Sequence, residues 1–137
     1  KCSEQAIVEG LDLAKSLGAE VPFLYAGEDP ITTLYAMPGA VTYQTALWDD
    51  LVKFAKDALQ RAKTLASNAG VKATTTLIEH QAPAVAIREA EKDYDMVIMG
   101  THGRHGFKRL MLGSVAEGVL RSATKPYLMI RHPNDSG

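Results

Sequence analysis

Residues 95–115 read DMVIMGTHGRHGFKRLMLGSV. A short hydrophobic stretch is followed by three spaced glycines, and a Gly113-Ser114 pair then precedes a segment with helical periodicity. The glycines thus lie between the end of a strand and the start of a helix. In open α/β sheets, ligands bind at the carboxyl ends of the strands, and glycine permits both left-handed backbone and the close approach of a ligand. The stretch therefore predicts a strand–loop–helix unit whose loop binds a ligand.

The same loop is suited to an anion. Gly113-Ser114 at a helix start offers backbone N–H groups, a hydroxyl and the positive end of the helix dipole. Cationic side chains follow the first glycines, at Arg104, His105, Lys108 and Arg109. Together these groups suit a triphosphate. The alternative is that the glycines only shape a tight connection.

Several more specific motifs are excluded around this loop. No Lys-Ser or Lys-Thr pair follows the glycines, as a P-loop requires, and the dinucleotide fingerprint belongs after the first strand of its fold. No nucleophile elbow surrounds Ser114 and no base is placed beside it, so we assign no catalytic residue and interpret Ser114 as a helix cap and phosphate donor. His102 and His105 lack metal-ligand spacing, and we interpret them as residues that line or flank the phosphates, with no metal site.

Outward from the loop, helix and strand patterns alternate along the chain. Apolar residues recur at helical spacing in 3–17, 45–69, 83–92 and 114–122, and strand-like runs occupy 20–26, 71–78, 95–99 and 126–131. Loops are expected at 27–43 and 100–112. Such alternation predicts one α/β domain over residues 1–137, with a mostly parallel sheet and helices on both faces.

Composition limits the class of protein. The chain has 137 residues, 46% hydrophobic and 23% charged, which favours a packed core over disorder. A net charge of −1 argues against binding nucleic acid through bulk positive charge. The single cysteine, Cys2, excludes an internal disulfide and fits a reducing cytoplasm. The apolar runs are too short to span a membrane.

The spacing of the glycines resembles that of a known family. Gly100-Thr101-His102-Gly103, nine residues and then Gly113-Ser114 are similar to the G-x2-G-x9-G-[ST] signature of ATP-binding universal stress proteins. SEQAIVEGLDLAKSLGAEV, residues 3–21, resembles the family's first helix and second strand, and residues 95–131 resemble its fourth strand through its last. The resemblance implies a doubly wound, five-stranded parallel sheet of order 3-2-1-4-5, nucleotide binding and a homodimer.

The resemblance also implies the binding residues. The backbone at Ala26 matches the position that holds the adenine edge, and the signature residues match the phosphate and ribose contacts. The full set is Ala26, Gly100, Thr101, His102, Gly103, Arg104, Gly113, Ser114 and Val115.

Two departures from the family stand out. The family's first strand, which ends in an acidic turn, has no counterpart, so we expect about ten further residues before Lys1 that form a central strand. Without that strand the sheet would have a gap of about 9–10 Å. The family's glycine after the third strand is replaced by Gln81, before Ala82-Pro83, which is expected to alter the ribose side of the pocket.

We therefore expect a cytoplasmic regulatory module that binds ATP, with or without Mg2+, and forms a homodimer through residues 126–131. With no general base in view, any ATPase activity is expected to be weak. One alternative is an enzyme on the same fold, a slow ATP hydrolase or an ATP-dependent transferase. The other is a nucleotide-free dimerisation module.

Overall fold

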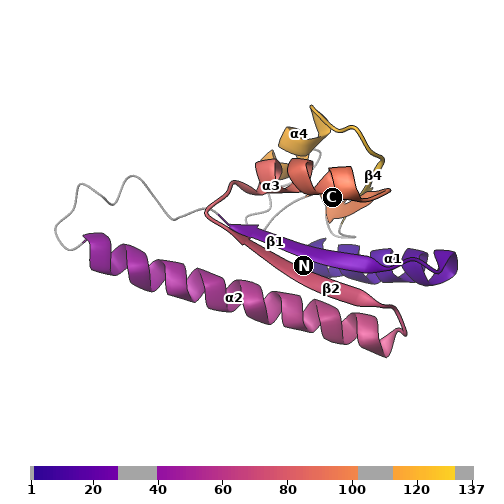
Figure 1. The fold of residues 1–137 in the computed structure, drawn as a ribbon, viewed down its shortest axis with the longest axis horizontal. Coiled ribbons are helices and arrows are strands. Elements are labelled where there is room, and N and C mark those ends of the chain that lie inside the picture. Colours follow the sequence, from indigo (N-terminus) through magenta and orange to yellow (C-terminus); the bar gives the residue numbers. More distant parts are fainter. Residues whose placement is uncertain (1, 28–39, 102–112, 132–137) are drawn as a thin grey trace.

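The computed structural model describes residues 2–27, 40–101 and 113–131. In these ranges the elements are α1 (Cys2–Leu17), β1 (Val21–Gly27), α2 (Ala40–Asn68), β2 (Ala73–Glu79), α3 (Pro83–Ala90), the 3-10 turn η2 (Glu91–Asp93), β3 (Val97–Gly100), α4 (Ser114–Leu120) and β4 (Tyr127–Ile130) (Figure 1). The alternation of helices and parallel strands confirms the predicted α/β class. No described helix combines the length and hydropathy that a membrane span requires.

The bounds differ from the expected ones mainly at α2, which begins at Ala40 rather than at residue 45. No proline or glycine separates Ala40 from residue 45, so nothing in the chain stops the helix from extending back to that point. The two long helices end where predicted. Gly18 and Gly70 have φ of +64° and +73°, the left-handed conformation typical of glycine just after a helix.

The strands form two parallel pairs. β1 pairs with β2 in the register Ala26↔Ile78, and β3 pairs with β4 in the register Gly100↔Ile130. Among the described strands, β1 and β3 do not pair with each other. The expectation of a central strand between β1 and β3 would have been wrong had they paired directly, and it stays a prediction.

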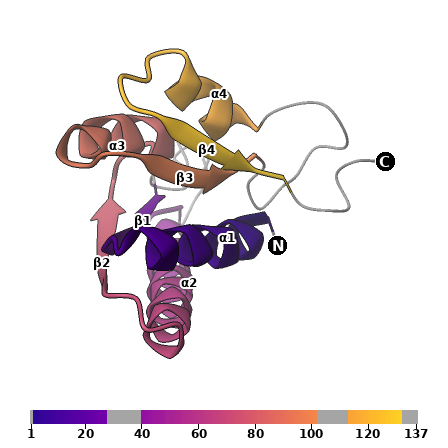
Figure 2. The same ribbon diagram turned by 90° about the vertical axis from the view of Figure 1, so that its right-hand side faces the viewer.

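Helices cover both faces of the strands. α1 packs against β3 and β4, α2 packs against β1 and β2, and α3 contacts both β1 and α4. Figure 2 shows α4 on one side of β3 and β4 and α1 on the other. A cluster of buried side chains from α1, α2 and the connection just before β2 forms the core on the α1 side: Leu11, Ala14, Ala66 and Val71.

Two glycines allow close packing between these layers. A Cβ at Gly118 in α4 would lie 3.0 Å from the Cβ of Ala84 in α3, and one at Gly10 in α1 would lie 3.4 Å from Cδ1 of Ile98 in β3. The contact at Gly118 is the tighter of the two, so α3 and α4 approach each other closely because one of them carries no side chain at the crossing.

Candidate functional site

The candidate site is at the carboxyl ends of the strands. Ala26 and Gly27 end β1 opposite Ile78 and Glu79 of β2. In the other pair, Gly100 ends β3 opposite Ile130. Because the strands of each pair are parallel, each pair presents its carboxyl ends together, as a ligand site of this fold requires.

Thr101 fastens the start of α4 to the end of β3. Its N–H donates to the carbonyl of Ile130 at 3.0 Å, and its own carbonyl accepts from the N–H of Gly113 at 2.8 Å. Thr101 is 4% exposed, so this junction is buried. Gly100, Thr101 and Gly113, which the sequence predicted as site residues, therefore come together in space. His102, Gly103 and Arg104 lie outside the described residues.

Ser114 has a different local role from the one expected. It is the first residue of α4 and is exposed, whereas Gly113 occupies the capping position with φ −64° and ψ 160°. The expectation that Ser114 caps the helix is thus wrong, because the capping position falls one residue earlier. Its hydroxyl instead lies at the surface of the helix start, and Val115 beside it is half-buried.

The glycines at the junction are not required by backbone conformation. Within the described ranges, positive φ occurs only at Gly18, Gly70 and His80. Gly100 and Gly113 therefore have backbone conformations open to other residues. Of the two reasons for glycine at these positions, access to left-handed backbone does not hold, whereas the close approach of a ligand stays a prediction.

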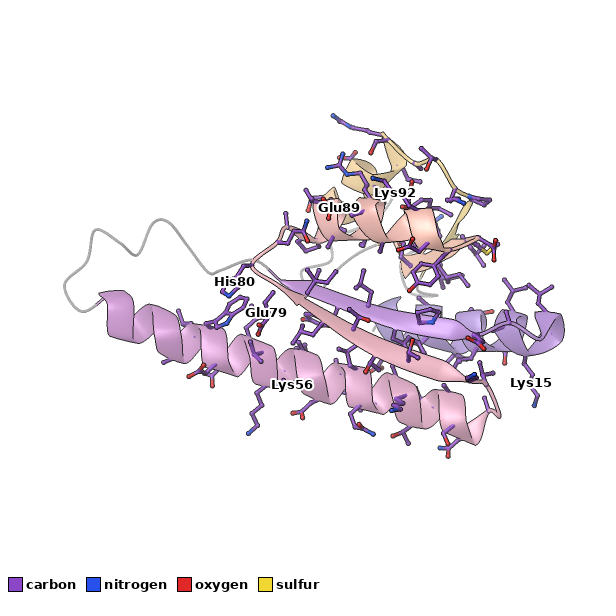
Figure 3. The ribbon with its side chains drawn as sticks, in the orientation of Figure 1. Lys15, Lys56, Glu79, His80, Glu89 and Lys92 are labelled. Atoms are coloured by element: carbon purple, nitrogen blue, oxygen red, sulfur yellow. The ribbon has the colours of Figure 1, made fainter. Side chains whose placement is uncertain are left out.

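The turn after β2 lies at the same edge as Ala26. The N–H of Gln81 donates to the carbonyl of Gly27 at 3.2 Å, which ties this turn to the end of β1. The Gln81 side chain donates from Nε2 to Oε2 of Glu89 in α3 at 3.1 Å. Figure 3 shows Glu89 on α3 and His80 at the end of β2, near α2. The glutamine that replaces the family's glycine thus has its side chain held on the α3 side.

Sequence reasoning missed one feature of this edge. The imidazole of His80 stacks on the indole of Trp48 in α2, with ring centroids 4.5 Å apart and planes 20° from parallel. His80 also has φ +62°, which is uncommon for a residue other than glycine. No local signal marks the pair, because its members belong to a helix and a turn that are far apart in sequence. In the described part of the chain, no group of three His, Cys, Asp or Glu is arranged to hold a metal ion.

Comparison with known proteins gives consistent matches. The model of the universal stress protein family matches residues 1–131. Universal stress protein MJ0531 of Methanocaldococcus jannaschii is 32% identical over 133 residues, which are 96% of this chain and 76% of that protein.

Solved structures share the fold. Universal stress protein UspA from Lactobacillus plantarum superposes with a TM-score of 0.81 at 22% identity, over 96% of this chain and 90% of that one. The universal stress protein from Archaeoglobus fulgidus, solved in complex with dAMP, gives a TM-score of 0.66 at 20% identity, over 93% and 86% of the two chains.

Proposed function

Because this chain belongs to the universal stress protein family, we propose that it binds an adenine nucleotide at the carboxyl ends of β1 and β3. ATP is the proposed ligand, with or without Mg2+, and the protein acts as a nucleotide-dependent regulatory module of the cytoplasm. Its single domain spans residues 1–137. The relative solved with dAMP supports the chemical class of the ligand.

The observation that carries the proposal is the buried junction at Thr101. It holds the end of β3 against the start of α4 through two backbone hydrogen bonds, at 3.0 and 2.8 Å. Gly100 and Gly113 are separated by more than a dozen positions in the signature, yet each adjoins Thr101 along the chain or through its backbone. This contact places both ends of the signature at the carboxyl end of β3, where ligands bind in open α/β sheets.

Each residue of the site has a proposed role. The backbone at Gly100 and Gly113 lines the phosphates, and the buried Thr101 holds these two glycines together. The exposed Ser114 hydroxyl donates to the phosphates, and Val115 packs beside them. The Ala26 backbone holds the adenine edge. His102, Gly103 and Arg104 complete the signature. With only seven residues, α4 contributes little through its dipole, so hydrogen bonds carry the affinity in this proposal.

We assign no catalytic residue, so ATP acts here as a bound signal rather than as a substrate. The rival functions are a slow ATP hydrolase or ATP-dependent transferase and a nucleotide-free dimerisation module. Retention of intact ATP with negligible release of ADP separates the regulatory module from the enzyme. Failure to bind ATP at all favours the dimerisation module.

The remaining proposals concern the sheet. We propose that the sheet has five strands in the family's order 3-2-1-4-5, which corresponds here to β2, β1, a further strand, β3 and β4. The support is that β1 and β3, which this order places on either side of the further strand, do not pair among the described residues. We also propose a homodimer through β4, which pairs only with β3 among the described strands.

The test of nucleotide binding is calorimetric titration of ATP into Gly113→Asp. The Gly113 N–H already donates to the carbonyl of Thr101, so the phosphates are proposed to bind the N–H groups of the first turn of α4. The new carboxylate would face the triphosphate and displace it from those groups. Hydrogen bonds to charged groups contribute about 1.5–3 kcal/mol each, so losing two lowers ATP affinity by about a hundredfold or more. Ser114→Ala costs less, about tenfold, because only one hydroxyl is lost.

Gln60→Glu serves as the control, because it adds the same charge on an exposed part of α2 and leaves ATP affinity unchanged. Far-ultraviolet circular dichroism should be native in all three variants. Unchanged ATP affinity in a folded Gly113→Asp protein would mean that the signature is only a connection.

A further inference from the structure

The stack of Trp48 and His80 has no role in the site as proposed so far. Trp48 is the only tryptophan of the chain. It is half-buried on α2, whereas His80 is exposed at the end of β2. The nearly parallel rings, 4.5 Å apart between centroids, form a two-membered aromatic stack with one inner and one outer ring.

The backbone conformation at His80 supports a specific role for the pair. Among the described residues, His80 is the only one other than glycine with positive φ. Such a conformation persists where its surroundings hold it, and it is concentrated at ligand sites. Here the hydrogen bond from Gln81 to Gly27 and the stack on Trp48 hold the turn on either side.

The pair also lies where a base is expected. Gly27, to which the turn is tied, directly follows Ala26, whose backbone is proposed to hold the adenine edge. Leu51, one turn after Trp48 in α2, approaches Gly27, since a Cβ built there would lie 3.5 Å from Cδ2 of Leu51. Trp48 and Leu51 thus place one side of α2 along the ends of β1 and β2.

We propose that Trp48 and His80 form a stacking platform for the base of the bound nucleotide. This inference rests on the proposed function and adds specificity-determining residues to it. A purine offers an extended π-face, and stacking of a base on aromatic side chains is a common source of affinity. The base extends the stack from its exposed, His80 side, while the phosphates lie at the junction of β3 and α4. The pair therefore contributes to binding of the base and not of the phosphates.

The experiment compares ATP with inorganic tripolyphosphate, which carries the charge and no base. Trp48→Leu and His80→Gly are titrated with both, and His80→Gly is chosen because glycine accepts φ +62° without strain. Stacking on one aromatic residue is worth about tenfold in affinity. Each variant should therefore lose about tenfold for ATP and nothing for tripolyphosphate. Trp48→Phe, which retains a ring, should recover most of the loss.

Two further measurements complete the test. Phe54→Leu is the matched control, because Phe54 is an aromatic residue of the same helix that packs edge-on against Tyr25 instead; its ATP affinity should stay at the wild-type value. In the wild-type protein, ATP should change the fluorescence of Trp48, and tripolyphosphate should not.

The outcomes separate this inference from the function on which it rests. If the wild type binds ATP and the Trp48 and His80 variants bind it equally well, the platform is wrong and nucleotide binding stands. An equal loss for ATP and tripolyphosphate also overturns the platform, because it indicates a general change of structure. If the wild type binds no ATP, the proposed function fails and the platform fails with it.

Discussion

At the scale of single residues, the carboxylate of Glu91 in η2 is buried and accepts several hydrogen bonds. Glu91 is 2% exposed, and it accepts hydrogen bonds from the hydroxyl of Thr124 at 2.6 Å, from the N–H of Thr124 at 2.9 Å and from the hydroxyl of Tyr127. The Thr124 hydroxyl, then Tyr127, then the Thr124 N–H lower the pKa of Glu91 below its ordinary value of 4.5. Burial, together with the hydrogen bond to Glu91, raises the pKa of the Tyr127 phenol, which therefore stays neutral.

This network makes part of the free energy of unfolding depend on pH. A carboxylate whose pKa is lowered on folding stabilises the native state in full above its unfolded pKa, and that contribution is lost as pH falls through the lowered value. We predict that Glu91→Gln lowers the urea midpoint at pH 6. The difference in midpoint between variant and wild type should shrink below pH 4.5, the ordinary pKa of this carboxyl group. Urea unfolding from pH 6 down to pH 3 measures this difference.

Glu89→Gln is the control, since it alters an exposed carboxylate in the preceding helix and should leave the pH dependence close to that of the wild type. Tyr127→Phe removes one of the donors to Glu91 and should show a smaller loss than Glu91→Gln. A Glu91→Gln difference that stays constant from pH 6 to pH 3 would show that the carboxylate's charge is not what stabilises the network.

Single residues also show where sequence reasoning succeeds and where it stops. Gly18 and Gly70 were predicted to end helices, and their left-handed conformation is the physical reason for glycine at both positions. Gly113 was assigned to the site from its spacing, but its φ of −64° does not require glycine. His80 adopts the strained conformation instead, and nothing local to a histidine after a strand predicts this, because its partner Trp48 comes from a distant helix.

At the scale of helices and strands, the periodic pattern predicted the described α-helices and strands, with the largest difference at the start of α2, whereas the 3-10 turn η2 was not predicted as a separate element. The pattern is informative because burial of one face of an element produces both the helical repeat of apolar residues and their alternation in strands. It leaves the start of α2 open, since the residues from Ala40 onward are compatible with either helix or loop. Periodicity also carries no information on how closely two helices cross, which depends on contacts such as that between Gly118 and Ala84.

The crossing of α3 and α4 gives a prediction for Gly118. Glycine to alanine in a helix normally gains about 0.8–1 kcal/mol. At Gly118 the new Cβ would lie 3.0 Å from Ala84, so the helices must separate and the gain should be cancelled. Gly118→Val adds still more atoms and should destabilise the protein by about 1–3 kcal/mol. Urea unfolding measures both changes.

Gly10→Ala is the matched control in α1. Its Cβ would meet Ile98 at 3.4 Å, a contact that the flexible end of the side chain can accommodate. This variant should therefore keep most of the gain in helix propensity. Equal stabilisation by Gly118→Ala and Gly10→Ala would contradict the proposed close packing of α3 on α4.

At the scale of the whole molecule, the order of elements was enough to predict an α/β fold with parallel strands. The pairing of the strands could not be predicted in this way, because it depends on long-range contacts that single segments do not encode. The four described strands form two separate pairs, and the central strand expected between them remains a prediction. The candidate site was likewise predictable only in part. The signature residues that meet at the Thr101 junction were identified from their spacing, whereas the residues proposed to bind the base could be identified only from the position of α2 beside β2.

The last prediction, a homodimer, concerns β4, which pairs only with β3 among the described strands. Leu128, opposite Ile98 in the strand pair, is 36% exposed, and an apolar edge strand tends to pair with another chain. Pairing of two copies of β4 across a two-fold axis covers this edge and sets like residues near each other. Light scattering at micromolar concentration should give twice the mass of one 14.8 kDa chain.

Leu128→Lys should then weaken the dimer by about tenfold or more, because like charges across paired strands repel and an apolar contact is lost. Val8→Lys makes the same change at a 45% exposed site on α1 and should leave the dimer intact. A wild-type protein that is monomeric at this concentration, or a dimer equally weakened by Val8→Lys, would place the contact elsewhere than β4.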